Sequence, residues 1–196
     1  TVKGVIWSIL ERFSVQGIQF VVMIIMARML TPNDYGLVGM LAVFIAVSQS
    51  LVDSGFSQAL IRKQDRTETD NSTVFYFNII VGFILYGLLF TLAPFIADFY
   101  NEPQLTAITR VIGLSVLFNS LVVVQRALLT IKIDFKTQAK AALTAAIISG
   151  VLGIWMAASG YGVWSIVVQQ LANLGINTLL LWILSHWRPS LTYSWK

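Results

Sequence analysis

The residues of this chain that could do chemistry are arginines and side-chain amides that recur at helical spacing. Ser8, Arg12, Gln16 and Gln19 follow one another at intervals of three or four residues, which places them on one face of a helix. Amides donate and accept hydrogen bonds, and arginine binds anions such as phosphate. This stripe indicates recognition of a polar, anionic ligand.

Similar polar faces occur on further apolar segments, and together they predict a helical bundle around a hydrated cavity. Ser149, Gly150 and Gly153 add small residues that permit close helix contact. The same amides could instead serve only as hydrogen bonds between helices, worth about 0.6 kcal/mol each. The candidate binding residues are Arg12, Gln16, Gln19, Gln49, Asn78, Asn119, Arg126, Gln170, Asn173 and Asn177, with Gln169 beside the last three.

Three roles remain open for Arg12. A charge at the centre of a bilayer costs roughly 2.5 to 3.5 kcal/mol, so the guanidinium must be hydrated or paired. It could bind an anionic ligand in the cavity, pair with Glu11 or Asp53, or extend to the headgroups at the inner surface. Arg28 lies at a predicted helix end, where extension to the headgroups explains it, and Arg126 is ambiguous for a similar reason.

The inventory of reactive residues argues against an enzyme. Cysteine is absent and His186 is the only histidine, which excludes thiolate sites and multi-histidine metal sites within this chain. No serine, histidine and carboxylate occur at catalytic spacing, and there is no glycine-rich phosphate loop. We therefore expect no catalytic residue, no metal and no cofactor.

The elements that must position these residues are membrane helices. Of the 196 residues, 57% are apolar and only 11% are charged, against roughly 25% charged in soluble domains. A hydrocarbon core of about 30 Å needs roughly 17 to 25 helical residues. The chain is therefore predicted to be an all-α integral membrane protein with six transmembrane helices, at residues 13–30, 35–52, 74–97, 107–129, 141–159 and 163–184.

The basic residues orient these six helices. With both termini in the cytoplasm, eleven of the thirteen lysines and arginines fall on the inner side, and only Arg28 and Arg110 fall outside. They form no single patch with interleaved aromatic residues, so nucleic acid is not an expected partner.

Local signals mark where the helices begin and bend. Thr31, Pro32 and Asp34 form a capping pattern that predicts a helix start, and the Gly160-Tyr161-Gly162 run predicts a short turn. Pro94 lies inside the third segment and predicts a kink. The chain begins without methionine and stops just beyond a predicted helix, so we expect residues 1–196 to form a single six-helix bundle within a longer protein.

Several short segments, in this order, resemble polysaccharide-biosynthesis flippases of the Wzx/PST type, which belong to the multidrug/oligosaccharidyl-lipid/polysaccharide superfamily. Those segments are Arg12-Phe13, Gln16-Gly17 and residues 27–38, 53–56, 59–61, 93–94, 99–100, 125–129, 134–136, 160–164 and 187–189.

The resemblance implies the N-terminal lobe of a two-lobe transporter in the bacterial inner membrane. The implied substrate is an undecaprenyl-pyrophosphate-linked oligosaccharide, flipped for O-antigen, capsule or exopolysaccharide synthesis. The implied partners are the lipid bilayer, the C-terminal lobe of the same chain, and candidate contacts with the polysaccharide polymerase and glycosyltransferases. Cationic cavity residues are expected to meet the pyrophosphate in such flippases, and Arg12 is the first candidate, with Arg28 and Arg126 behind it.

Three other functions fit the sequence less well. A cation-coupled drug or metabolite antiporter of the same superfamily should carry an acid within the membrane, whereas Glu11 and Asp53 both lie towards the inner face. A membrane polymerase or ligase needs a large outer loop, and the predicted outer loops are short. A purely structural scaffold would not need the polar stripes.

Overall fold

The computed structural model describes residues 2–53, 68–132, 134–185 and 187–189, with side chains described from residue 13 onward except those of Asp53, Glu68 and Asp70. Every secondary-structure element in these ranges is an α-helix, as predicted. Their order along the chain is α1 (Val2–Ala27), α2 (Pro32–Asp53), α4 (Glu68–Tyr100), α5 (Gln104–Ile112), α6 (Leu114–Ile131), α7 (Phe135–Ala158) and α8 (Val163–Leu184).

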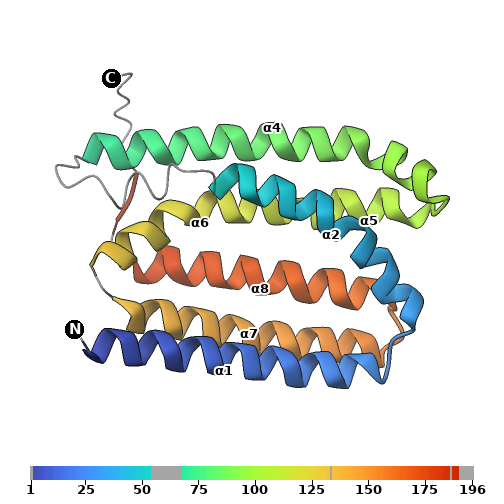
Figure 1. The fold of residues 1–196 in the computed structure, drawn as a ribbon, viewed down its shortest axis with the longest axis horizontal. Coiled ribbons are helices and arrows are strands. Elements are labelled where there is room, and N and C mark those ends of the chain that lie inside the picture. The colour runs from blue at the N-terminus through green and yellow to red at the C-terminus, as the bar shows by residue number, and fades with distance from the viewer. Residues whose placement is uncertain (1, 54–67, 133, 186, 190–196) are drawn as a thin grey trace.

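The helices run up and down along one long axis (Figure 1). The starts of α1, α4 and α7 lie at the same end of the bundle as the end of α8, and the turns after α1, α4 and α7 lie at the other end. The charge-based topology, with an even number of crossings, requires this alternation.

The helices pack in a row, with α2 across one part of it. Helix α1 packs on α7, α7 on α8, α8 on α6, and α6 on α4, while α2 contacts α6, α8, α4 and α5. Although α1 and α2 are consecutive, the main contacts of α1 are with α7 and not with α2. This separation leaves space between α1 and α2.

Five of the six predicted membrane spans are helices long and apolar enough to cross a bilayer. They are Pro32–Val52, Asn71–Tyr100, Gln104–Ile131, Phe135–Ala158 and Val163–Leu184. The sixth, α1, has 26 residues in all, of which the apolar part with described side chains is Phe13–Ala27. Large apolar side chains such as Phe83, Phe95 and Ile183 are more than half exposed, as lipid-facing residues would be.

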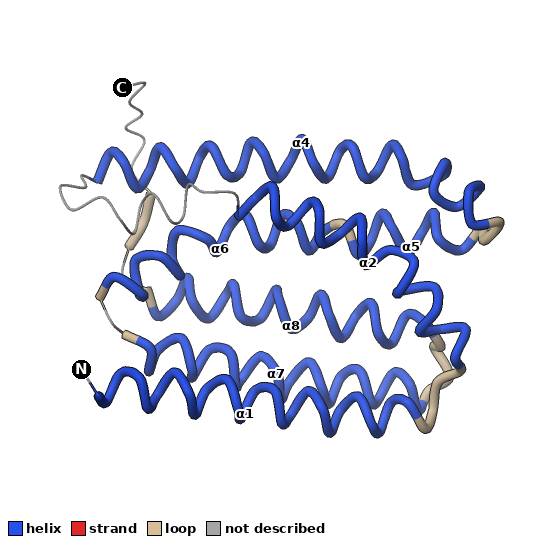
Figure 2. The backbone as a smooth tube through the Cα atoms, viewed as in Figure 1, coloured by secondary structure: helices blue, strands red, loops and turns tan. Residues whose placement is uncertain are grey.

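The predicted helix start at Thr31 is confirmed in atomic detail. The backbone N–H of Thr31 donates to Asp34 Oδ2 at 2.9 Å, and the hydroxyl of Thr31 donates to the same oxygen at 2.7 Å. Gly160 and Gly162 have φ angles of 80° and 53°, a left-handed conformation that glycine adopts without strain. The turn predicted between α7 and α8 is therefore confirmed. Pro94 lies inside α4, which bends towards its C-terminal end (Figure 2).

The fourth predicted span is confirmed as Gln104–Ile131, in which α5 and α6 meet at Gly113. A β-carbon at Gly113 would lie 2.9 Å from the carbonyl oxygen of Thr109 and 3.3 Å from the ring of Tyr86. One predicted boundary was wrong. Helix α7 begins at Phe135, six residues before the predicted start, because Asp134 caps it. The Asp134 carboxylate accepts hydrogen bonds from the backbone N–H of Thr137 at 3.1 Å and from its hydroxyl at 2.7 Å.

We predict that a fluorescent protein fused after Lys132 fluoresces in bacterial cells and that one fused after Asn101 does not. The two positions lie at opposite ends of the bundle, and basic residues gather at the end that carries Lys132. Alkaline phosphatase fused at the same positions should give the opposite pattern of activity. The reverse result would show that the charge bias has been misread.

We predict that Gly82→Ala lowers the free energy of unfolding of the full-length protein by about 1 to 3 kcal/mol. A β-carbon at position 82 would lie 2.6 Å from the hydroxyl oxygen of Ser120 and 2.8 Å from its Cβ, so α4 and α6 would have to move apart. The matched control is Gly87→Ala on the same helix, where nothing lies within 4 Å. Thermal unfolding in detergent checks this, and equal melting temperatures for the two variants would contradict it.

Candidate functional site

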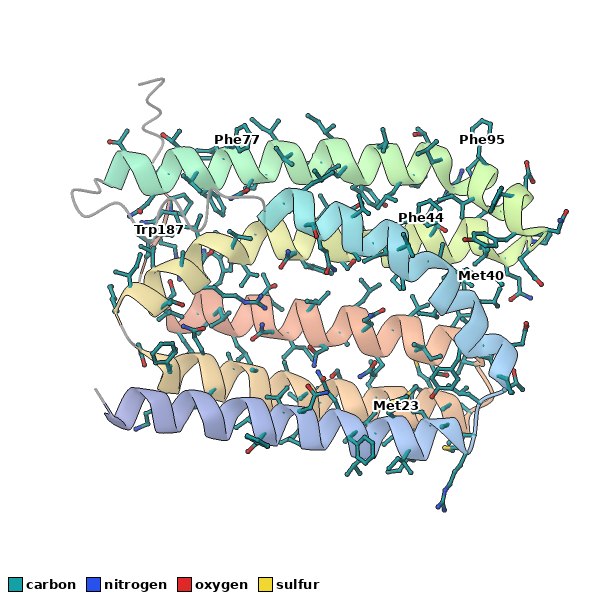
Figure 3. The ribbon with its side chains drawn as sticks, in the orientation of Figure 1. Met23, Met40, Phe44, Phe77, Phe95 and Trp187 are labelled. Carbon is teal, nitrogen blue, oxygen red and sulfur yellow. The ribbon has the colours of Figure 1, made fainter. Side chains whose placement is uncertain are left out.

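A polar cavity lies between α1, α2 and α8. Its volume is about 440 Å³, within the roughly 300 to 1,000 Å³ range of small-molecule pockets. Figure 3 shows Met23, one of its lining residues, on α1. The lining residues are Gln19, Val22, Met23, Met26, Tyr35, Gln49, Ile166, Gln169, Gln170, Asn173 and Leu174.

Five of these eleven residues carry side-chain amides and none carries a charge. The amides come from three helices that lie far apart in the sequence: Gln19 from α1, Gln49 from α2, and Gln169, Gln170 and Asn173 from α8. Each amide offers two donor hydrogens and an acceptor oxygen, so the cavity can pair with both the donors and the acceptors of a neutral polar ligand.

Most of these amides have no partner in the part of the chain that the structure describes. Among the described residues, the side chains of Gln19, Gln49, Gln169 and Gln170 form no hydrogen bond. A polar group removed from water without a partner costs roughly 2 to 7 kcal/mol. In a membrane these four amides therefore require water or a ligand in the cavity.

Asn173 is held in place by the neighbouring helix. Its Nδ2 donates to the hydroxyl oxygen of Ser149 on α7 at 3.1 Å, and that hydroxyl donates to the carbonyl of Ala146 at 3.3 Å. Ser149 is fully buried. The interaction fixes the face that α8 presents to the cavity.

Glycines on α7 allow the two walls of the cavity to approach it closely. A β-carbon at Gly150 would lie 2.6 Å from Cγ2 of Val22, and one at Gly153 would lie 2.7 Å from Cβ of Gln169. The absence of these β-carbons lets α1 and α8 both pack directly on α7. The position of α1 against α7 keeps it away from α2.

Helices α1 and α2 diverge from the turn that joins them. The two helices meet at the turn before Pro32 and separate towards the other end of the bundle (Figure 1). Tyr35 lines the cavity near this turn. A β-carbon at Gly162 would lie 3.1 Å from Oδ1 of Asp34, so the turn between α7 and α8 packs against the start of α2.

The structure brings four of the sequence-predicted site residues together and places five others outside the polar cavity. Gln19, Gln49, Gln170 and Asn173 line the cavity. Gln16 lies on α1 with its side chain exposed and is not part of the lining. The side chain of Arg12 lies outside the described residues.

The remaining candidates lie within the bundle. Asn78 on α4, Asn119 on α6 and Asn177 on α8 are each at most 9% exposed. Arg126 on α6 is half-buried and makes an interaction elsewhere in the protein. None of these four side chains lines the polar cavity.

Two lining residues were not among the candidates. Gln169 lies one turn before Asn173, a spacing of four that could have identified it as part of the same face. No sequence pattern identified Tyr35, because it lines the cavity only as a result of where α1 and α2 meet.

The described residues contain no group of three or more histidine, cysteine, aspartate or glutamate side chains that could hold a metal ion.

Comparison with known proteins identifies related sequences but no related structure. Residues 25–196 match the family model described as "Polysaccharide biosynthesis protein". No solved structure matches the chain.

Similar curated proteins come from several bacteria. The succinoglycan biosynthesis transport protein ExoT of Rhizobium meliloti is 23% identical over 192 residues, covering 98% of this chain and 39% of ExoT. The teichuronic acid biosynthesis protein TuaB of Bacillus subtilis is 27% identical over 194 residues, covering 97% and 40%. The lipopolysaccharide biosynthesis protein WzxC of Escherichia coli is 25% identical over 115 residues, covering 59% and 23%. The chain spans about two fifths of the length of the first two relatives.

We predict that a cysteine at Gln170 reacts much faster with a membrane-impermeant maleimide than a cysteine at Leu179. The two positions lie about half a turn apart around α8, Gln170 in the cavity and Leu179 64% exposed on the outside. Thiols react as thiolates, which form in water and not in lipid. Labelling is measured in membranes that carry the full-length protein without other cysteines, and equal rates would contradict a hydrated cavity.

Proposed function

Because the chain belongs to the family of polysaccharide biosynthesis proteins, we propose that it is the N-terminal lobe of a flippase for undecaprenyl-pyrophosphate-linked oligosaccharides. The full-length protein would turn repeat units from the inner to the outer leaflet of the bacterial inner membrane, for O-antigen, capsule or exopolysaccharide synthesis. Membership of the family, together with its apolar helices, makes the chain part of a multi-pass membrane protein.

The observation that carries this proposal is the amide-lined cavity between α1, α2 and α8. It has four side-chain amides without a hydrogen-bond partner among the described residues, between helices whose outer faces suit lipid. A protein with only a structural role would not need such groups, because hydrocarbon offers them no hydrogen bonds.

Moving an oligosaccharide head across the hydrocarbon core of a membrane requires such a cavity. Each hydroxyl of a sugar that entered hydrocarbon without a partner would cost roughly 4 to 8 kcal/mol. An oligosaccharide with a pyrophosphate therefore cannot cross unaided at a useful rate. Polar side chains in a cavity can replace the water around the head while the polyprenyl tail stays in the lipid.

We propose Arg12 as the residue that meets the pyrophosphate. At 1.5 Å per residue, position 12 lies two turns and about 10 Å from position 19 along α1, on the same side of the helix axis. The cation would therefore lie beyond the cavity, on the side away from the turn between α1 and α2. Arg28 and Arg126 are secondary candidates.

The proposed mechanism needs more than this lobe. A second lobe in the remainder of the full-length protein would close the cavity, and rocking of one lobe against the other would expose it to each leaflet in turn. We propose no enzymatic step and no cofactor. Polysaccharide polymerase and glycosyltransferases are the proposed partners on either side of the transport step.

The alternative, a cation-coupled drug or metabolite antiporter, is less well supported. Such coupling requires an acid within the membrane. No carboxylate lines the polar cavity among the residues that the structure describes.

We predict that bacteria lacking the full-length gene accumulate lipid-linked repeat units on the inner leaflet and make little polymer. The wild-type gene should restore polymer, whereas a gene encoding residues 1–196 alone should not, because one lobe cannot enclose the head. Mass spectrometry of extracted lipids measures the repeat units. Normal polymer in the deletion strain, combined with increased drug sensitivity, would favour the antiporter.

Variants of Arg12 test whether this residue binds the pyrophosphate, independently of whether the protein is a flippase. Arg12→Ala should restore at most about a tenth of the polymer, since loss of a charged hydrogen bond costs roughly 1.5 to 3 kcal/mol, and Arg12→Lys should restore more. Full rescue by Arg12→Ala would remove the site assignment and leave the flippase proposal intact.

A further inference from the structure

The charge of the polar cavity does not suit the anionic part of the proposed substrate. A pyrophosphate presents only acceptor oxygens and carries negative charge, so its binding sites use arginine, lysine or backbone N–H groups. None of the eleven lining residues is basic. The oxygen of each lining amide would also repel a phosphate oxygen, unless every amide turned its nitrogen inward.

The same cavity suits a neutral sugar ring. A sugar hydroxyl both donates and accepts, as does a side-chain amide. Gln19, Gln49, Gln169 and Gln170 have this capacity unused within the described part of the chain. The ring of Tyr35 and the side chains of Val22, Met26 and Ile166 provide apolar walls, against which the C–H faces of a sugar can pack.

Gln49 and Gln170 lie between two cavities. Besides the cavity of about 440 Å³, both line a second cavity of about 200 Å³, bounded by α2 and by Ile112 at the end of α5. Their amides therefore lie where the two spaces meet and can contact a ligand that occupies either.

We infer that this cavity binds an uncharged sugar of the transported oligosaccharide through its hydroxyl groups, at Gln19, Gln49, Gln169 and Gln170, and that the pyrophosphate binds outside it. The inference rests on the proposed flippase function. On this inference, a neutral site recognises the sugar and a separate cationic site recognises the phosphate. Selectivity among sugars then depends on how well the sugar hydroxyls match the amides that line the cavity.

The experiment measures binding to purified full-length protein by calorimetry with two probes. One is the phosphate-free repeat-unit oligosaccharide released from the organism's own polysaccharide, and the other is inorganic pyrophosphate. The variants are Gln49→Leu, Gln170→Leu, Gln170→Glu and Gln170→Lys. The control is Gln104→Leu, an exposed glutamine at the start of α5 that lines neither cavity.

Each leucine variant should weaken oligosaccharide binding about two- to tenfold, the effect of one neutral hydrogen bond, and leave pyrophosphate binding unchanged. Gln170→Glu should keep oligosaccharide binding within about threefold of wild type, because a carboxylate also accepts from hydroxyls. Gln170→Lys should not tighten pyrophosphate binding. Gln104→Leu should change neither, and unchanged melting temperatures should show that all variants fold.

Two results would overturn the inference. One is oligosaccharide binding that the leucine variants leave unchanged. The other is a phosphate pattern at position 170, in which lysine strengthens pyrophosphate binding and glutamate abolishes it. Failure of the proposed function is distinguishable, because it would appear as normal polymer and no accumulated repeat units in the deletion strain, whatever the binding data show.

Discussion

The close contact of α1 with α7 is the constraint on which the rest of the structure depends. Gly150 lets Val22 approach the backbone of α7, and Gly153 does the same for Met26 and Gln169. With α1 fixed on α7, the chain must turn sharply at Thr31 and send α2 across α8 and α6 instead. The cavity is the space left between two consecutive helices that have different neighbours. A larger side chain at either glycine would change the width of that space before it changed any residue that lines it.

In a membrane, the amides that line this cavity need hydrogen-bond partners. In water, four amides that find no partner among the described residues would be ordinary surface groups. Between helices whose outer faces carry Phe95, Ile84 and Ile183, they can be satisfied only by what enters the cavity. Elsewhere in the bundle, polar groups form hydrogen bonds between helices. The indole N–H of Trp182 donates to the carbonyl of Leu121 at 3.0 Å, and the hydroxyl of Thr178 donates to the carbonyl of Phe118 at 3.4 Å. Those interactions join helices, whereas the cavity amides remain available.

This contrast explains how far the sequence could predict the site. Hydropathy and charge bias predicted the spans, and the pattern at Thr31 and Asp34 predicted a start that the hydrogen bonds confirm. Helical spacing showed that Gln19, Asn78 and Asn177 each lie on a polar face, but it could not show what that face meets. Asn78 and Asn177 are buried between helices, and Gln19 borders a cavity. The difference depends on which helices are neighbours, and that depends on close contacts such as the one at Gly150. The sequence predicts that Gly150 permits a close contact but does not show which helix it meets.

A neutral cavity also fits the demands of transport better than a charged one. A transported head must be bound in one conformation and released in the other, so each contact should be modest. A hydrogen bond between neutral groups contributes about 0.5 to 1.5 kcal/mol, and one to a charged group about 1.5 to 3. Several amides can therefore distinguish one arrangement of hydroxyls from another without holding any sugar tightly, since a misplaced hydroxyl would leave both itself and an amide unpaired. In the proposed flippase, a single cation outside the cavity would then bind the pyrophosphate that the lipid-linked repeat units share. On this division, substitutions among Gln19, Gln49, Gln169 and Gln170 would change which sugars are accepted while the site for the common anchor stays the same.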